Sequence, residues 1–166
     1  MIKFLKKKFL KEINIKKDIK KMHKLFEVSQ NFSNSNMLKK FFLLLAWREH
    51  NKIFYKYSCD ISPNCRLGNV VFRHPIGIIM GGGSILEDDV IVHQNVTFGA
   101  LRFSKEERRG ISCNQIIKKG TIICAGAKIL GDVTIGENCI IGANAVVTKN
   151  VPDGATVVGY NKIILK

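Results

Sequence analysis

The sequence predicts an all-β left-handed parallel β-helix of hexapeptide repeats, preceded by a short N-terminal α-helical segment. Three observations support this prediction. One aliphatic residue recurs every six positions without a slip: Ile117, Ile123, Ile129, Ile135, Ile141 and Val147. Four positions after each of them comes a small or β-branched residue: Thr121, Ala127, Val133, Cys139, Ala145 and Val151. At Asp60 the apolar spacing changes from a helical pattern to this one.

The period of six excludes an α-helix, because six steps of about 100° do not return to the same face. Simple alternation along a strand would not restrict one position to Ile, Leu or Val. A triangular coil explains both positions, since each unit is one short strand and one turn, and three units close a coil. The aliphatic side chain fills a corner of the interior, the small one lies beside it, and coils stack through parallel strands.

The same rule appears earlier in the chain, before an interruption. The earlier pairs are Ile61 with Cys65, Leu67 with Val71, Met80 with Ser84, Leu86 with Val90, and Val92 with Val96. An insertion at about residues 100–115 separates the two blocks and is rich in charged residues. Loops that interrupt a regular scaffold commonly carry function. We therefore expect a basic helical segment at 1–58 and a β-helix domain at 59–166 with this inserted loop.

The basic charge of the chain is concentrated in residues 1–58. This part holds 15 Lys/Arg and 4 Asp/Glu, a net charge of +11, whereas residues 59–166 hold 12 and 9, a net charge of +3. Apolar residues follow helical spacing over 2–28 and 37–57, with a polar loop at 31–36. Such a segment touches an anionic membrane surface, packs on its own domain or on a partner subunit, or simply presents a solvated basic helix face.

Several other classes of protein are disfavoured by the composition. The five cysteines form no CxxC pair and indicate reduced thiols. No stretch has the features of a signal peptide, and the longest apolar run, residues 41–47, is too short to cross a bilayer. No nucleic-acid-binding motif accompanies the charge, so we expect no nucleic-acid partner. We expect a cytoplasmic protein, with peripheral contact at the inner face of the membrane left open. His23 and His50, in the helical segment, are expected on the surface.

A set of eight short motifs lies in the β-helix part of the chain. They are Asp60-Ile-Ser-Pro, Cys65-Arg-Leu-Gly68, Phe72-Arg-His-Pro-Ile-Gly77, Leu86-Glu-Asp-Asp-Val90, Asn95-Val-Thr-Phe-Gly99, Ala125-Gly-Ala-Lys-Ile-Leu-Gly131, Ile141-Gly-Ala-Asn-Ala-Val-Val147 and Val151-Pro-Asp-Gly154. The set resembles the hexapeptide-repeat acyltransferases, and most closely the serine acetyltransferase-like group, which includes polysaccharide acetyltransferases of the colanic acid type. The resemblance covers roughly residues 38–166. It implies a homotrimer with active sites in clefts between neighbouring β-helices and acetyl-CoA as co-substrate.

The resemblance also implies a catalytic pair. His74 falls on the family's catalytic histidine, and Asp60 falls on the aspartate that orients it. A neutral imidazole suits removal of a hydroxyl proton because its pKa lies near operating pH. A carboxylate on the other ring nitrogen fixes the tautomer. Asp60 precedes His74 by 14 residues, a little under one 18-residue coil, so the two side chains could face each other on adjacent coils. Without the resemblance, His74 would be interpreted as an exposed turn residue.

Two family positions near the acceptor differ in this chain. The acid that often precedes the catalytic histidine is Arg73 here. The Arg-His pair with which serine enzymes hold serine reads Cys113 and Asn114. We assign Arg73 and Asn114 to substrate binding, together with His93, which either lines the cleft or lies on the surface.

Candidate contacts for CoA also follow from the resemblance. Family members let the pantetheine arm run against small residues, which here are Gly99, Ala125 and Ala143. A backbone N–H of such a residue could donate to the thioester carbonyl, although tight packing explains these small residues nearly as well. Lys149 and Lys162 are candidates for the CoA phosphates.

The loss of the Arg-His pair favours a sugar hydroxyl as the acceptor. The expected function is therefore an acetyl-CoA-dependent O-acetyltransferase of bacterial surface polysaccharide biosynthesis. The alternative is serine O-acetyltransferase of cysteine biosynthesis, which turnover with L-serine would reveal. A metal enzyme of the carbonic anhydrase kind needs three histidines per site. The β-helix part holds only His74 and His93, so we expect no metal.

Overall fold

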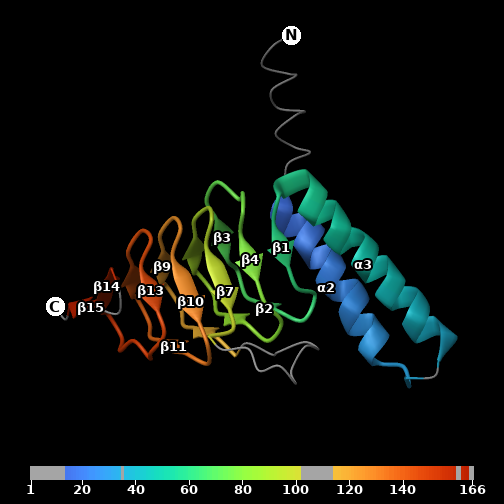
Figure 1. Cartoon of the computed structure of the whole chain (residues 1–166). Helices are drawn as coiled ribbons and strands as arrows, with labels where there is room; N and C mark the ends of the chain where they lie inside the picture. Colours follow the sequence, from blue (N-terminus) through green and yellow to red (C-terminus); the bar gives the residue numbers. More distant parts are fainter. Residues whose placement is uncertain (1–13, 35, 102–113, 160–161, 165–166) are drawn as a thin grey trace, which may run out of the picture.

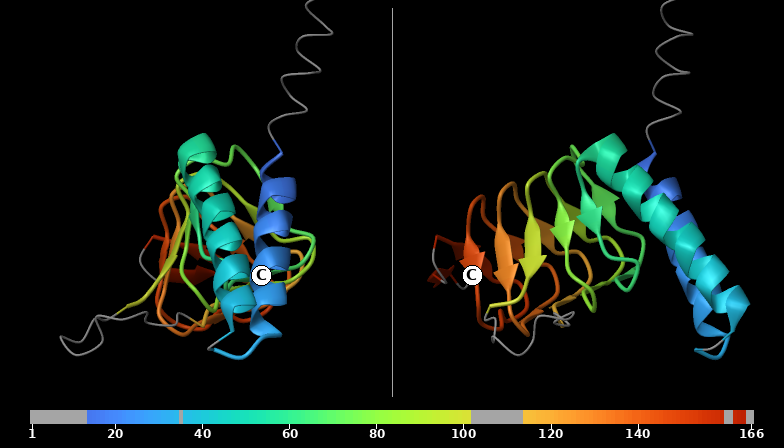
Figure 2. Two further views of the ribbon diagram at one scale, coloured as in Figure 1. Left: turned by 90° about the vertical axis from the view of Figure 1, so that its right-hand side faces the viewer. Right: turned by 45° about the vertical axis from the view of Figure 1, so that its right-hand side comes forward.

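Figure 1 shows a helical hairpin followed by a β-helix. The computed structural model describes residues 14–34, 36–101, 114–159 and 162–164. The hairpin consists of α2 (Ile15–Gln30) and α3 (Met37–Tyr57), which lie side by side across the end of the β-helix where its first coil begins (Figure 2). The predicted helix at 37–57 has the bounds of α3. Of the predicted helix at 2–28, residues 2–13 lie outside the described residues.

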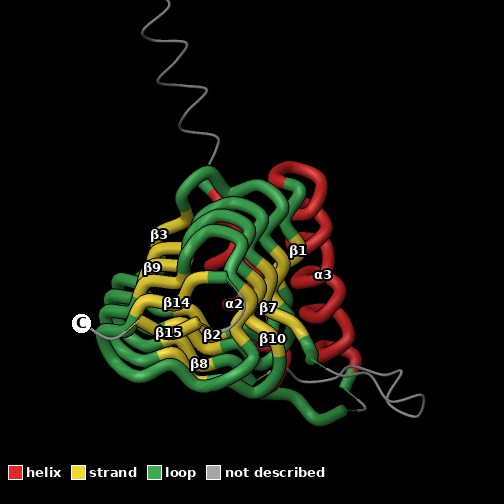
Figure 3. The backbone as a smooth tube through the Cα atoms, turned by 60° about the vertical axis from the view of Figure 1, so that its left-hand side comes forward, coloured by secondary structure: helices red, strands yellow, loops and turns green. Residues whose placement is uncertain are grey.

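The strands are short, as a six-residue repeat requires. They are β1 (Asp60–Ile61), β2 (Arg66–Leu67), β3 (Val71–Phe72), β4 (Ile79–Met80), β5 (Ile85–Leu86), β6 (Ile91–Val92), β7 (Thr97–Gly99), β8 (Ile116–Ile117), β9 (Ile122–Ile123), β10 (Lys128–Leu130), β11 (Thr134–Ile135), β12 (Ile140–Ile141), β13 (Val146–Val147), β14 (Thr156–Val158) and β15 (Lys162–Ile164). Three sheets wall the coil (Figure 3). Sheet A is β1-β4-β7-β10-β13, sheet B is β2-β5-β8-β11, and sheet C is β3-β6-β9-β12-β14-β15. Within the described residues the strand pairings are parallel, except that of β14 with β15. The predicted left-handed parallel β-helix is therefore confirmed.

The strand register shows how the insertion is accommodated. Ile79 pairs with Thr97, and Ile116 pairs with Thr134, each 18 residues later. Ile85 pairs with Ile116, 31 residues later, because the insertion adds 13 residues to that coil. The coils on both sides of the insertion therefore stack in one register, and the extra chain leaves from a single corner. Residues 102–113 of the insertion lie outside the described residues.

The core follows the two-position rule of the sequence. All six aliphatic residues of the second block are at most 1% exposed, and the small residues four positions later are also buried. Burying each of the six aliphatic side chains contributes roughly 1.5–3 kcal/mol to the stability of the fold. In the first coil the predicted pairing of Leu67 with Val71 is wrong: Val70 is buried, whereas Val71 is half-buried in β3.

This exception has a simple geometric cause. β2 begins at Arg66 and β3 at Val71, five residues apart, so one residue is missing from this repeat. β4 begins at Ile79, eight residues after the start of β3, so the following turn is two residues longer than a standard repeat. That longer turn contains His74.

The hairpin and the first coil share one apolar core. Met22 of α2 and Ile53 of α3 are fully buried and belong to the same cluster as Ile61 of β1. α3 ends at Tyr57, where Ser58 adopts a left-handed conformation (φ 51°) and its N–H donates to the Phe54 carbonyl at 2.9 Å. The division into domains at 1–58 and 59–166 stays a prediction.

No helix within the described ranges is both long enough and apolar enough to cross a membrane.

Candidate active site

The predicted catalytic residue lies at one corner of the coil, where the chain passes from sheet C to sheet A. We call this the C–A corner, formed by residues 73–78, 93–96, 124–127 and 142–145. Backbone hydrogen bonds stack its turns. The Arg73 N–H donates to the Val92 carbonyl at 2.8 Å, and the His93 N–H donates to the Ile123 carbonyl at 3.0 Å. The Asn144 N–H donates to the Ala125 carbonyl at 2.9 Å. The predicted residues at this corner are therefore aligned along one edge: His74, His93, Ala125 and Ala143.

His74 lies in the turn that is two residues longer than the repeat. It has a positive φ of 51° and is exposed. Its carbonyl accepts a hydrogen bond from the Ile76 N–H at 2.8 Å, and the Ile76 carbonyl accepts one from the Asn95 N–H at 2.9 Å. Histidine is among the residues that tolerate a left-handed conformation best, and such positions are often functional. The turn thus presents the imidazole on the outside of the coil, anchored to the turn above it.

Asp60 lies beside the end of this turn but has a different partner from the one predicted. Its N–H donates to the Ile78 carbonyl at 2.9 Å, and the Ser58 carbonyl accepts from the Gly77 N–H at 3.0 Å. The Asp60 carboxylate oxygen Oδ1, however, lies 2.9 Å from Nε2 of His50 on α3. This oxygen is bonded to His50 and not to the predicted partner His74, because α3 ends against β1 and places the His50 imidazole there.

The expectation that His23 and His50 are surface residues is wrong. The His50 side chain is 19% exposed, and its Nδ1 is buried without a partner among the described residues. His23 is half-buried on α2, and burial lowers the pKa of its imidazole, a shift opposed by a hydrogen bond to the Ser62 backbone. The signal that could have located both was their position on α2 and α3, which cover the first coil.

The remaining predicted residues lie at a second corner, where the chain passes from sheet A to sheet B. Gly99 ends β7, Asn114 follows the insertion, and Lys149 follows β13. The Asn114 N–H donates to Asp132 Oδ1 at 3.1 Å, and Lys149 is exposed. The strands of sheet A separate this A–B corner from the C–A corner, so within one chain the two groups of predicted residues do not converge. Lys162 lies in β15, but its side chain is outside the described residues.

Two residues at these corners were missed from the sequence. Gln115 is fully buried, and its amide nitrogen donates to the Gly99 carbonyl at 2.9 Å and to the Gly131 carbonyl at 2.8 Å. Its amide oxygen accepts from the Ser84 hydroxyl at 2.8 Å. Gln115 occupies the position of its repeat that usually holds a small residue. An amide at such a position was the feature of the sequence that could have indicated its role. Lys128 lies on sheet A and donates through Nζ to the Asn95 carbonyl at 2.9 Å, which places a cation beside the C–A corner.

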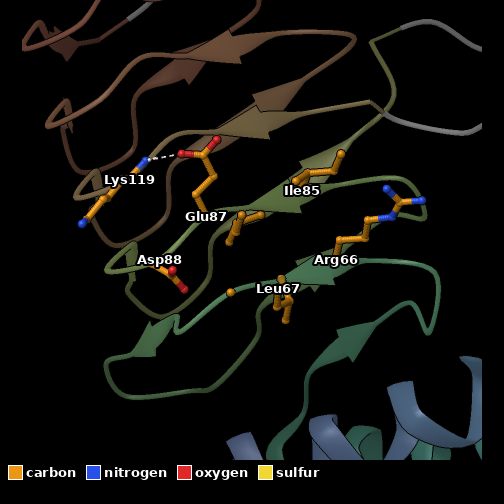
Figure 4. A pocket seen from close by; sticks show the side chains of 8 residues that line it. Arg66, Leu67, Ile85, Glu87, Asp88 and Lys119 are labelled. Atoms are coloured by element: carbon orange, nitrogen blue, oxygen red, sulfur yellow. Dashed lines mark hydrogen bonds between the residues drawn. The ribbon is translucent and has the colours of Figure 1, made fainter.

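Two hollows of the part of the chain that the structure describes lie elsewhere. One of about 410 Å³ lies over sheet B, where Arg66, Glu87 and Lys119 line it and the Lys119 N–H donates to Glu87 Oε2 at 3.0 Å (Figure 4). Another of about 640 Å³ lies between α2 and the first coil. Neither is lined by His74 or Asp60. Among the described residues, no group of three or more His, Cys, Asp or Glu could hold a metal ion.

The chain shares sequence similarity with known proteins. Residues 116–149 match the family described as "Bacterial transferase hexapeptide (six repeats)". The chain is 37% identical over 117 residues to a serine acetyltransferase of Buchnera aphidicola, an alignment that covers 70% of this chain and 43% of the relative. The chain spans about two fifths of the length of the curated relatives it matches.

Solved structures show the same similarity. The crystal structure of Neisseria gonorrhoeae serine acetyltransferase superimposes with a TM-score of 0.76 at 27% identity, covering 92% of this chain and 54% of that one. A serine acetyltransferase in complex with CoA superimposes with a TM-score of 0.73 at 30% identity, covering 90% and 55%.

The fold and these matches indicate the class: the β-helix is built of hexapeptide repeats and is similar to that of bacterial hexapeptide transferases. Within that class, the chain is similar to serine acetyltransferases. The expectation of a polysaccharide acceptor is contradicted by these matches, which favour the serine alternative. The polysaccharide acceptor was expected from the replacement of a single residue pair in the insertion, whereas the similarity to serine acetyltransferases extends over most of the chain.

Proposed function

We propose that this protein is a serine O-acetyltransferase that moves the acetyl group of acetyl-CoA to the hydroxyl of L-serine. The observation that supports it most strongly is the likeness of 90% of the chain to a serine acetyltransferase solved with CoA. The stacking of His74, His93, Ala125 and Ala143 along one edge of the coil supports it further. Such an edge offers an imidazole next to small residues over which a long, thin thioester arm can lie.

In the proposed reaction His74 acts as the general base. It takes the proton of the serine hydroxyl while that oxygen attacks the thioester carbonyl carbon. A C–O bond forms, the C–S bond breaks, and the CoA thiolate leaves and takes up the proton from the imidazolium. Backbone N–H groups at the C–A corner are the proposed donors to the transient oxyanion. The products are O-acetylserine and CoA.

Asp60 orients His74 in this proposal, and His50 holds Asp60. The carboxylate has two oxygens: Oδ1 is bonded to His50, which leaves Oδ2 for the ring of His74. His50 is therefore a positioning residue. We expect His50→Leu to lower kcat while the KM values for serine and acetyl-CoA stay near wild type. His50→Gln retains a donor and is expected to recover part of kcat, which a loss of packing alone would not predict.

We also propose that the active unit is a homotrimer. The residues assigned to catalysis lie at the C–A corner, whereas Gly99, Asn114 and Lys149 lie at the A–B corner of the same chain. A second β-helix packed alongside would bring the A–B corner of one subunit to the C–A corner of its neighbour. Equilibrium sedimentation of the purified chain measures the subunit number, and a catalytically active monomer would contradict this arrangement.

The function is tested by following CoA release with a thiol reagent in the presence of acetyl-CoA and L-serine. Wild type is expected to turn over, and His74→Ala is expected to lose about 10²–10⁴-fold in kcat. The variant should keep its subunit number and its affinity for CoA, because His74 is exposed and its side chain supports no core contact. Absence of serine-dependent CoA release by the wild type, or full activity of His74→Ala, would overturn the proposal.

A further inference from the structure

Helix α3 is apolar on two opposite sides. Its inner side is buried through Ala46, Ile53 and Tyr57. Leu44 lies nine residues before Ile53, about 180° around the helix, and is 62% exposed. The large apolar side chains that α3 exposes are Met37, Leu38, Phe41, Leu44, Trp47, Phe54 and Tyr55. A helix that only covers its own domain has one apolar side, so the outer side of α3 is available to a further partner.

The outer side of α3 is basic as well as apolar. We define the outer α3 surface as Met37, Lys40, Phe41, Leu44, Trp47, Arg48 and Tyr55. Lys40 and Arg48 are exposed on it, and neither has an ion-pair partner within the part of the chain that the structure describes. The one acidic residue of α3, Glu49, is on the buried side, with its carboxylate 2.6 Å from the Lys21 ammonium.

The rest of the hairpin adds to this positive charge. The described residues of α2 and α3 carry ten Lys or Arg and three Asp or Glu. Asp18 is neutralised by Lys52 and Lys56, at 3.8 and 3.3 Å. Because the hairpin lies across one end of the molecule (Figure 2), this surface has no β-strand in front of it.

Charge decides between the two simplest partners. A second copy docking through the same surface would bring Lys40 and Arg48 of both copies into one interface, since a twofold contact uses the same surface on each copy and this surface includes no acidic residue. Like charges placed together at an interface disfavour it. An anionic lipid surface instead offers phosphates to the cations and an apolar layer to Phe41 and Leu44, and indole rings favour that boundary.

We propose that the outer α3 surface lies on an anionic membrane, with Phe41, Leu44 and Trp47 inserted among the lipids and Lys40 and Arg48 at the head groups. Three hairpins at one end of a trimer would engage the same bilayer together, which raises the apparent affinity. The proposal is independent of the reaction catalysed, because no catalytic residue belongs to this surface.

Trp47 is the only tryptophan of the chain, so its fluorescence reports directly on this surface. Without lipid, the full-length protein should show the emission of a water-exposed indole. Vesicles of phosphatidylglycerol should shift that emission to shorter wavelength and carry the protein down on sedimentation. Vesicles of phosphatidylcholine alone should do neither.

Variants separate the two parts of the proposed contact. Phe41→Ser combined with Leu44→Ser should weaken binding to phosphatidylglycerol vesicles by about tenfold or more, because apolar burial is lost. Lys40→Glu combined with Arg48→Glu should weaken it at low salt. Val158→Ser, an exposed apolar residue at the far end of the β-helix, is the matched control and should bind as wild type.

Three outcomes would overturn the proposal. The first is no response of Trp47 to phosphatidylglycerol vesicles. The second is a buried indole before any lipid is added, which would mean that a second copy or another part of the chain covers α3. The third is binding that the two double variants leave unchanged.

Discussion

The β-helix and the helical hairpin are stabilised in different ways. In the β-helix one rule is applied at every coil, so that residues such as Ile123 and Ile141 are fully buried and polar groups are mostly confined to the corners. In the hairpin, polar and ionic contacts reach into the packed region: the Tyr57 hydroxyl donates to Asp18 at 2.9 Å, and Glu49 is bonded to Lys21. A repeated apolar interior is insensitive to pH, whereas a helix pair held partly by charges depends on pH and salt. This difference also separates the proposed functions, since the β-helix carries the catalytic edge and the hairpin carries the outer α3 surface.

The largest expected effect breaks the rule of the β-helix at one position. β12 holds two neighbouring isoleucines, of which Ile141 is fully buried and Ile140 faces outward and is half-buried. Ile141→Ala should lower the free energy of unfolding by about 2–5 kcal/mol, through lost transfer energy and a residual cavity. Ile140→Ala should cost less than about 1 kcal/mol. Urea unfolding followed by circular dichroism measures both, and equal losses would contradict the predicted inward and outward alternation.

A smaller effect is expected where a buried amide, Gln115, interrupts the apolar interior of the β-helix. The Gln115 amide nitrogen donates to carbonyls on two coils, and its amide oxygen accepts from the hydroxyl of Ser84, which is also fully buried. Gln115→Met keeps the volume but leaves these groups unpaired, at a cost of about 1–3 kcal/mol. Ser84→Ala in the Gln115→Met background should cost less than Ser84→Ala alone, because the hydrogen bond between the two side chains is already lost. Additive losses in this double-mutant cycle would show that the two side chains do not act together.

The hairpin is expected to respond to pH through His23. Burial lowers the pKa of this imidazole, so the folded state binds its proton less readily than the unfolded chain does. Its contribution to stability is present above the ordinary histidine pKa of 6.5 and is lost as pH falls through the lower folded value. Wild type should therefore lose more stability than His23→Gln between roughly pH 7 and pH 5. The other histidines are common to both proteins, so parallel unfolding curves would mean that His23 is not the responsible group.

The sequence predicted the β-helix well because its signal is local and repeated. Each aliphatic side chain packs in the same way against its own coil and the next one. A period of six in the sequence is therefore sufficient to infer that these positions are buried in a β-helix. The sequence did not predict that Val70, and not Val71, is buried. The first coil lacks one residue between β2 and β3 and has two additional residues between β3 and β4, and these changes nearly cancel. The alignment of His74 with His93 follows from register, but the partner of Asp60 does not. His50 is ten residues away on a helix, and no spacing rule relates a helix to the coil that it covers.

The smallest expected change in stability gives the sharpest test of the proposed CoA site, to which Gly99 contributes from the A–B corner. Among the described residues, a methyl group at Gly99 would meet Leu130 Cδ2 at 3.6 Å and Thr97 Cγ2 at 3.8 Å, both ordinary contacts, so Gly99→Ala should leave the free energy of unfolding nearly unchanged. If the pantetheine arm runs against this backbone, the same variant should raise the KM for acetyl-CoA and leave that for serine near wild type. Gly126→Ala is the contrasting variant, because Gly126 has a φ of +73° and a methyl group there would collide with the Asn144 side chain. It should be destabilised by about 1–3 kcal/mol. Unchanged kinetics in Gly99→Ala would mean that the small residue at this position serves packing of the coil and that CoA binds elsewhere.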